Sequence, residues 1–306
     1  MRVRPGSTPV GAAGILSGVR LAEVLQRSTE WLAGRGSDSP RLDAEVLIGH
    51  ALGLQRIALY TEADRPLTDD EMATCRALIA RRGELEPVAH ITGRRAFGRL
   101  DLEVTPDVLV PRPDTEVVVD VVVEVAPEGA RIVDWGTGSG AIALSVADLR
   151  PDVTVVGLEQ SAAALAVAQR NLAAAPELVD RVRLLESDGM TAVVGEPFDL
   201  VVSNPPYLVP ADLERYPALR HEPEQALVAG PVGTEDHARV AAEAAVALAP
   251  GGWLVLEVGE GQAEAVEGIL ATAGFADLGR RADLAGITRV IWGRSAPPGA
   301  PASPGS

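Results

Sequence analysis

The spacing of apolar residues separates the first part of the chain from the rest. Before residue 83, apolar side chains recur three or four positions apart, as at Leu21, Val24 and Leu25. This is the spacing of one face of an α-helix. The pattern therefore predicts a small all-α domain in residues 19–95.

Beyond Pro113, short apolar runs alternate with helical stretches. The runs are rich in Val, Leu and Ile, as are strands that are buried on both faces of a sheet. Alternating strands and helices predict an α/β fold in residues 114–294, a doubly wound, Rossmann-like parallel sheet covered by helices on both faces. We expect strands at residues 131–135, 153–158, 182–185, 198–203 and 253–258, and helices at 162–174 and 235–248.

Two local signals mark element boundaries. Thr68 is followed three residues later by Glu71, which predicts a capping box at the start of a helix. Residues 96–113 alternate between apolar and polar around Thr-Pro-Asp at 105–107. This alternation predicts a β-hairpin that links the two domains.

Composition excludes several kinds of chemistry. All 27 basic residues are arginine, which excludes the lysine of a Walker A loop and of Schiff-base catalysis. The single Cys75 excludes a disulfide framework, and the four histidines lack metal-ligand spacing, so no metal is expected. Residues 1–18 and 295–306 are dominated by Pro, Gly, Ser, Ala and Arg, and we expect both to be disordered tails.

Hydropathy and charge limit the partners. No apolar run approaches the roughly 20 residues of a membrane helix, and the N-terminus lacks the apolar core of a secretory signal, so we expect a cytoplasmic protein without membrane contact. The net charge is −16, and residues 101–306 hold 13 Arg against 31 acidic residues. A surface of that sign repels a phosphate backbone, so direct nucleic-acid binding is not expected.

A glycine-rich turn follows the first predicted strand. The sequence Asp-Trp-Gly-Thr-Gly-Ser-Gly at 134–140 lets the backbone turn tightly and come close to a ligand. Glu159 ends the second strand, where a carboxylate can bind both hydroxyls of a ribose. Together these features indicate a nucleoside-containing cofactor. The turn also satisfies the G-x-G-x-x-G/A fingerprint, so a nicotinamide enzyme fits this evidence as well.

The fourth predicted strand ends in Asn204-Pro205-Pro206-Tyr207. The Asn204 side-chain oxygen and the Pro205 carbonyl can accept both N–H groups of one planar NH2 group. They would orient the nitrogen lone pair toward an electrophilic methyl group and stabilise the positive charge that develops. Tyr207 would lie against the planar group and exclude water. This arrangement suits methylation of an amide or amino nitrogen by S-adenosyl-L-methionine.

The chain resembles the HemK/PrmC family of protein-(glutamine-N5) methyltransferases from about residue 19 to 294. The resemblance is carried by AHITGRRAFGRLDLEVTPDVLVPRPDTE, DWGTGSGAIALSVA, SNPPYL, HEPEQALVAGPVGTEDH and LAPGGWLVLEVGEGQ. The family methylates the glutamine of the GGQ motif in class 1 peptide chain release factors. The resemblance thus implies a class I S-adenosylmethionine-dependent domain behind a helical substrate-recognition domain, with release factors as partners. We expect a monomer.

The resemblance also implies a role for each motif. The methionine end of the cofactor would lie on Gly136, Thr137, Gly138, Ser139 and Gly140, its ribose on Glu159, and its adenine end at Asp188 and Gly189. Asn204 would touch both cofactor and substrate, and Pro205, Pro206 and Tyr207 would complete the glutamine pocket. Three positions depart from the family pattern: Glu159 replaces an Asp, Gly189 replaces the aromatic residue of some members, and Ile287 replaces an Arg.

Several polar residues have two interpretations. Arg112, Asp114 and Glu116 either approach the cofactor and the glutamine or form a solvated cluster beside two prolines. Glu222 either orients the substrate or is a turn residue. Trp135 is expected in the core.

Three other functions share some of these features. A DNA or RNA adenine N6-type amino-methyltransferase would share the Asn-Pro-Pro-Tyr chemistry, but the acidic catalytic part disfavours it. A nicotinamide-dependent oxidoreductase is disfavoured by the lack of lysine. A binding module that has lost catalysis is disfavoured by the intact motif at 204–207.

Overall fold

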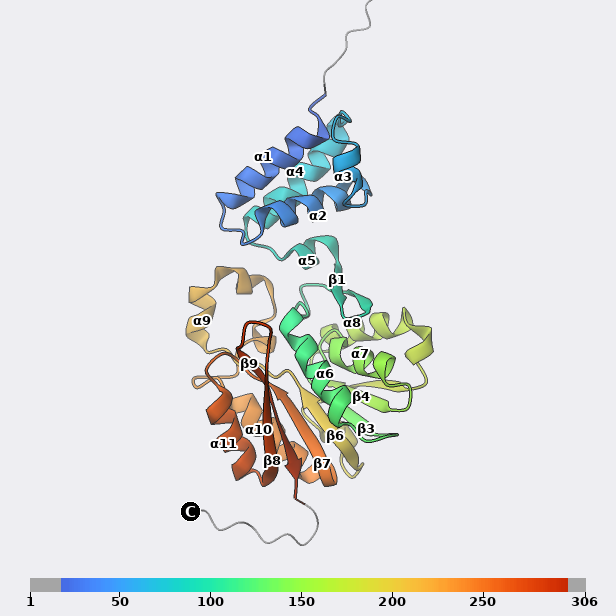
Figure 1. The fold of residues 1–306 in the computed structure, drawn as a ribbon, viewed down its shortest axis with the longest axis vertical. Helices are drawn as coiled ribbons and strands as arrows, with labels where there is room; N and C mark the ends of the chain where they lie inside the picture. Colours follow the sequence, from blue (N-terminus) through green and yellow to red (C-terminus); the bar gives the residue numbers. More distant parts are fainter. Residues whose placement is uncertain (1–17, 297–306) are drawn as a thin grey trace, which may run out of the picture. The chain divides into compact units, whose positions relative to one another are not determined.

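The structure, a computed structural model, describes residues 18–296 and divides into two compact units (Figure 1). The first unit ends at Ile91 and the second begins at Thr92. The tails expected at residues 1–18 and 295–306 lie almost entirely outside the described residues, and Ser295 is the last residue of a strand.

The first unit is helical, as the apolar spacing predicts. Its helices are α1 (Leu21–Ala33), α2 (Pro40–Leu52), α3 (Ala58–Thr61), α4 (Asp69–Gly83) and α5 (Val88–Thr92). Leu21, Leu47 and Ile79 belong to one buried core. The capping box is confirmed, because Thr68 Oγ1 accepts from the Glu71 amide and the Glu71 carboxylate accepts from the Thr68 amide over 2.9 Å.

The second unit opens with a β-hairpin whose position differs from the prediction. Its antiparallel strands are β1 (Arg94–Phe97) and β2 (Leu100–Glu103), so the turn is formed by Gly98 and Arg99 and not by residues 105–107. Gly98 has a φ of +54°, which a two-residue hairpin turn requires and glycine supplies. Pro106 has no N–H for a ladder, so the Thr-Pro-Asp segment forms a local turn in the loop after β2.

A sheet of seven strands forms the centre of the second unit, in the order β5-β4-β3-β6-β7-β9-β8. The five predicted strands are β3 (Arg131–Trp135), β4 (Thr154–Glu159), β5 (Val182–Glu186), β6 (Phe198–Ser203) and β7 (Leu248–Glu257), and they are parallel. The Rossmann-like architecture is therefore confirmed. Two strands that the apolar pattern does not reveal, β8 (Phe275–Ala282) and β9 (Thr288–Ser295), complete one edge, and β9 runs antiparallel to its neighbours.

Helices cover both faces of the sheet (Figure 1). Helices α6 (Glu116–Val125) and α7 (Ala141–Leu149) pack on one face, and α10 (Glu235–Ala247) and α11 (Ala263–Thr272) on the other. Neighbouring residues of one strand alternate between the two cores: Ile132 lies with α6 and α7, and Val133 with α10 and α11. Helix α8 (Ala162–Ala173) contacts β4 and β5. No helix in the described part of the chain is long and apolar enough to cross a membrane.

Candidate active site

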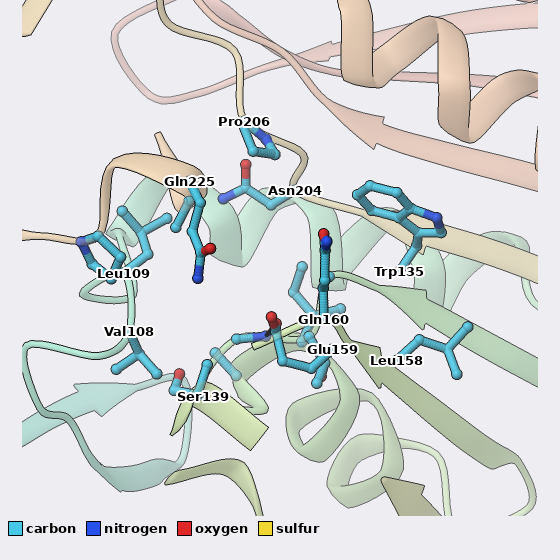
Figure 2. A pocket seen from close by; sticks show the side chains of 18 of the residues that line it. Val108, Leu109, Trp135, Ser139, Leu158, Glu159, Gln160, Asn204, Pro206 and Gln225 are labelled. Atoms are coloured by element: carbon cyan, nitrogen blue, oxygen red, sulfur yellow. Dashed lines mark hydrogen bonds between the residues drawn. The ribbon is translucent and has the colours of Figure 1, made fainter. Parts of the chain in front are cut away.

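The carboxyl ends of β3, β4 and β6 border one pocket in the second unit (Figure 2). The chain passes from β3 outward to β4 and β5, and then returns to place β6 on the other side of β3. The boundary between β3 and β6 is thus the topological switch point, where doubly wound sheets bind ligands.

The turn after β3 has a backbone conformation that favours glycine. Gly136, Gly138 and Gly140 have φ values of +72°, +56° and +85°, a region that side chains with a Cβ rarely occupy. A Cβ at Gly136 or Gly138 would meet nothing within 4 Å. Conformation, and not crowding by the protein, therefore selects glycine at these two positions and leaves the backbone open to a ligand.

Asp134 stabilises this turn through hydrogen bonds. Its Oδ2 accepts a hydrogen bond from Thr137 Oγ1 over 2.6 Å and another from the Ala143 amide over 3.1 Å. The side chain is buried, and burial raises its pKa to about 7. Asp134 thus connects the turn to the first turn of helix α7.

Glu159, at the end of β4, lines the pocket beside the glycine turn and contacts it. Its Oε2 accepts from the Gly138 amide and its Oε1 from the Ser161 amide, each over 2.9 Å. A carboxylate offers about four acceptor positions, so each oxygen keeps the capacity to bind a further hydroxyl group.

Glu243 of α10 organises the side of the pocket near β5. Its Oε2 accepts from the Trp135 indole over 2.8 Å and from the Met190 amide over 3.0 Å, and its Oε1 accepts from Arg239 Nε over 2.9 Å. Trp135 belongs to the core, as expected, and also lines the pocket.

Gly189 and Asp188 differ in their relation to the pocket. Gly189 lines it, and a Cβ there would lie 2.4 Å from the Glu243 carboxylate, so a side chain at this position would require Glu243 to move. The Asp188 carboxylate does not line the pocket but pairs with Arg239 over 2.6 Å and is 62% exposed.

Asn204 lies directly beyond β6 and forms part of the pocket wall beside Pro206 (Figure 2). Its Nδ2 donates to Thr115 Oγ1 over 3.3 Å. Pro206 shares this wall, whereas Pro205 is buried behind it. The Tyr207 ring lies outside the wall, 3.1 Å from the place that a Cβ on Gly259 would occupy, and burial raises the pKa of its hydroxyl to about 12.

An ion pair joins the two loops that face the glycine turn. Arg112 pairs with the buried carboxylate of Glu222, which also accepts from the Val110 amide over 2.9 Å. The pocket is lined by residues on both sides of this pair, among them Leu109 and Gln225. Arg112 and Glu222 thus shape the pocket through the loops they join, and their own side chains do not line it.

Two further acidic residues of the segment after Arg112 have structural partners. Asp114 pairs with Arg289 of β9 over 2.9 Å. Glu116 accepts from the Gly98 amide over 3.2 Å and so connects the hairpin turn to α6. Neither carboxylate lines the pocket.

The structure brings together most of the residues predicted for the site. Those in the wall are Gly136, Thr137, Gly138, Ser139, Glu159, Gly189, Asn204 and Pro206, while Gly140, Asp188, Pro205 and Tyr207 are outside it. Sequence reasoning missed Thr115, Gln160 and Gln225, which also line the pocket. Gln160 directly follows Glu159, so its place at a strand end was a usable signal. Thr115 and Gln225 lie within segments that carry the family resemblance, which was the signal available for them.

Comparisons with known proteins identify related domains and a shared fold. A family model described as the PrmC N-terminal domain matches residues 23–93, and one described as the methyltransferase small domain matches residues 114–221. A methyltransferase structure from Pyrococcus furiosus, 20% identical, aligns with a TM-score of 0.51 over 72% of this chain and 98% of that one, and so shares the fold.

Closer relatives are enzymes of one kind. The release factor glutamine methyltransferase of Geobacter sulfurreducens is 44% identical over 276 residues, which cover 90% of this chain and 96% of that protein. That of Burkholderia pseudomallei is 46% identical over 270 residues, which cover 85% and 94%. The chain therefore belongs to the release factor glutamine methyltransferase family of S-adenosylmethionine-dependent enzymes.

Proposed function

We propose that this protein methylates the side-chain amide nitrogen of the GGQ glutamine in class 1 peptide chain release factors. In a chain of this family, the observation that carries the proposal is the hydrogen bonding of the Asn204 side-chain amide. Its amide nitrogen is engaged by Thr115, and its amide oxygen has no hydrogen-bond partner within residues 18–296. An open acceptor beside a nucleoside-type pocket suits a substrate that offers an NH2 group.

The residues around the glycine turn fit S-adenosylmethionine, which supplies an electrophilic methyl group when bound. Gly136 and Gly138 offer open backbone for its methionine end, since no Cβ would obstruct either position, and Thr137 and Ser139 line the same pocket. Glu159 has acceptor positions left for the ribose hydroxyls. Gly189 lines the place for the adenine end, and Asp188 acts there through its pair with Arg239.

Asn204 would act on the reacting nitrogen. An amide nitrogen is a poor nucleophile, because its lone pair is delocalised into the carbonyl group. An Asn204 oxygen and a Pro205 carbonyl that accept its two N–H groups would orient the lone pair and stabilise the developing positive charge. Tyr207, whose ring lies behind this wall, would support Pro206 and the backbone of the motif. The departing amide proton would pass to water, so no strong base is required.

The helical unit would recognise the release factor. Residues 23–93 match a family model of their own, separate from the catalytic one. We propose that the enzyme acts as a monomer, because one chain carries both parts. We further propose that it does not bind nucleic acid directly, since residues 101–306 hold 31 acidic residues against 13 Arg.

The experiment is mass spectrometry of a purified release factor incubated with this protein and S-adenosylmethionine. We expect a gain of one methyl group, about 14 Da, on the GGQ glutamine. Asn204→Ala is expected to abolish the gain while it still binds S-adenosylmethionine, because the cofactor contacts of the glycine turn and Glu159 remain.

Transfer of the methyl group to DNA or RNA in the same assay, with none to the release factor, would contradict the proposal. That result would identify an amino-methyltransferase of nucleic acid with the same motif. Full activity of Asn204→Ala on the release factor would leave the substrate correct and remove the role given to Asn204.

A further inference from the structure

The indole ring of Trp135, at the end of β3, is held from two directions in the wall of the pocket (Figure 2). Its N–H donates to Glu243 Oε2 over 2.8 Å. The guanidinium carbon of Arg239 lies over the ring, 5.4 Å from its centre. The polar atom of the indole is bound and a cation covers its ring, so the side chain has a fixed orientation.

The two residues that hold the ring are themselves fixed. Arg239 and Glu243 lie one turn apart on α10, and Arg239 Nε donates to Glu243 Oε1 over 2.9 Å. Arg239 Nη2 also donates to Asp188 over 2.6 Å, and Arg239 itself lines the pocket. The indole, the Glu243 carboxylate and the Arg239 guanidinium therefore form one connected group in the pocket wall.

The segment after β5 locates this group within the pocket. Glu243 Oε2 accepts from the Met190 amide over 3.0 Å as well as from the indole, so the ring lies on the same side as this segment. A Cβ on Gly189 would lie 2.7 Å from Arg239 Nη2 and closer still to the Glu243 carboxylate. The group thus occupies the room that a side chain at position 189 would need. Among the described residues that line the pocket, Trp135 is the only aromatic one.

This side of the pocket is the place left for the base of a bound nucleoside. Glu159, at the end of β4, has acceptor positions for the ribose hydroxyls. The base and the methionine end leave the ribose at different carbons. With the methionine end on the glycine turn, the base extends toward the segment after β5, where Gly189 lines the pocket. The flat faces of a purine bind well to an aromatic side chain.

We propose that Trp135 is the aromatic surface that binds the adenine base of the cofactor, and that Glu243 and Arg239 are positioning residues that hold its ring. The hydrogen bonds from the indole and from Arg239 Nε to the Glu243 carboxylate carry the positioning part. The inference rests on the proposed function only through the cofactor, because it takes the bound nucleoside to be that of S-adenosylmethionine.

The test compares two ligands of the full-length enzyme by titration calorimetry. S-adenosylhomocysteine carries the base and has no methyl group to transfer, whereas S-ribosylhomocysteine has the ribose and amino-acid ends without the base. We expect Trp135→Leu to raise the Kd for S-adenosylhomocysteine about tenfold and to leave that for S-ribosylhomocysteine unchanged. Trp253→Leu is the matched control and should change neither Kd, because Arg294 lies over the Trp253 ring at the same 5.4 Å but Trp253 does not line the pocket.

Tryptophan fluorescence gives a second measurement, which serves if Trp135→Leu does not fold. Trp135→Phe keeps an aromatic ring and should still bind S-adenosylhomocysteine, but the quenching that accompanies binding to the wild type should disappear. Trp253→Phe should keep the quenching. Glu243→Gln places an NH2 group against a donor, either Arg239 Nε or the indole N–H. It should weaken the quenching and raise the Kd for S-adenosylhomocysteine alone.

An unchanged Kd for S-adenosylhomocysteine in folded Trp135→Leu would overturn the inference. Equal losses for the two ligands would do so as well, and so would quenching that persists in Trp135→Phe. Wild-type quenching and affinity in Glu243→Gln would overturn the positioning role. The expected binding pattern without methylation of a release factor would contradict the proposed function and leave the role of Trp135 intact.

Discussion

The hydroxyl of Ser203, the last residue of β6, donates to the backbone carbonyl of Trp135, the last residue of β3, over 2.7 Å. The two residues are also partners in the register of the parallel strands. Both are buried. The bond therefore connects the two strand ends at the switch point. The glycine turn follows one of these ends and Asn204 follows the other, so the bond helps to fix their relative positions.

Removal of this hydroxyl is expected to destabilise the catalytic unit. Ser203→Ala leaves the buried Trp135 carbonyl without its partner, which costs about 1–3 kcal/mol in the free energy of unfolding. Ser145→Ala is the matched control, because Ser145 is equally buried but its hydroxyl has no partner within the described residues. Urea unfolding of the two variants should show a clear loss only for Ser203→Ala. Equal losses would contradict the role of the bond.

Gly189 provides a test of the pocket wall near Glu243. Gly189 and Gly195 both have positive φ values, +61° and +83°, but only at Gly189 would a Cβ meet the Glu243 carboxylate, at 2.4 Å. Gly189→Ala should therefore displace Glu243, lower the thermal midpoint and raise the Kd for S-adenosylmethionine by at least about fivefold. Gly195→Ala, at a position with nothing within 4 Å, should lower the midpoint less and leave the Kd unchanged.

The sequence alone predicts those parts of the fold in which the burial of a segment is reflected in its apolar pattern. Buried parallel strands such as 131–135 and 198–203 read as apolar runs because both of their faces are covered. Strand β8 was missed because most of its side chains are exposed, so Arg280 and Arg281 interrupt any apolar run. The apolar–polar alternation predicts the hairpin turn at residues 105–107, later in the chain than the actual turn at Gly98. A two-residue turn at Gly98 gives only a short sequence signal, so the pattern did not identify it.

The candidate site was predictable where a residue is tied to a strand end. Gly138, Glu159 and Asn204 follow directly from strands, and all three line the pocket. Thr115 and Asn204 were not predictable as partners, because they are 89 positions apart in the sequence and meet through tertiary packing. Asp188 precedes Gly189 in the chain but does not line the pocket, and its carboxylate pairs with Arg239, which does.

Glu159 should determine cofactor affinity. Glu159→Gln replaces one accepting oxygen by an NH2 group, which would face a backbone N–H of Gly138 or Ser161 and could not accept from a ribose hydroxyl. We expect the Kd for S-adenosylmethionine to rise about 10- to 100-fold, measured by titration calorimetry. Glu186→Gln is the control, since Glu186 is the register partner of Glu159 on β5 but is exposed and outside the pocket. A similar rise in both variants would point to lost negative charge, and not to the ribose contact.

Glu257 should make stability depend on pH in a direction that is unusual for a carboxylate. Its pKa in the folded state, about 7, lies above its ordinary value of 4.5, because burial disfavours the charged form. Between these two values the folded protein binds more protons than the unfolded chain, so its stability falls as the pH rises. The full contribution is present below pH 4.5 and is lost by about pH 7, with an upper limit of about 3 kcal/mol.

The measurement is the free energy of urea unfolding at pH 5 and pH 8 for the wild type, Glu257→Gln and Glu260→Gln. Other groups titrate in all three proteins, among them Asp134, whose pKa burial also raises to about 7, and their contributions cancel in the comparison. We expect the loss of stability between pH 5 and pH 8 to be smaller by up to about 3 kcal/mol in Glu257→Gln than in the wild type. Glu260, three residues further along, is exposed, so Glu260→Gln should follow the wild type. The same pH dependence in all three proteins would mean that the Glu257 carboxylate is charged at pH 5, and that Arg112 and Arg289 nearby outweigh its burial.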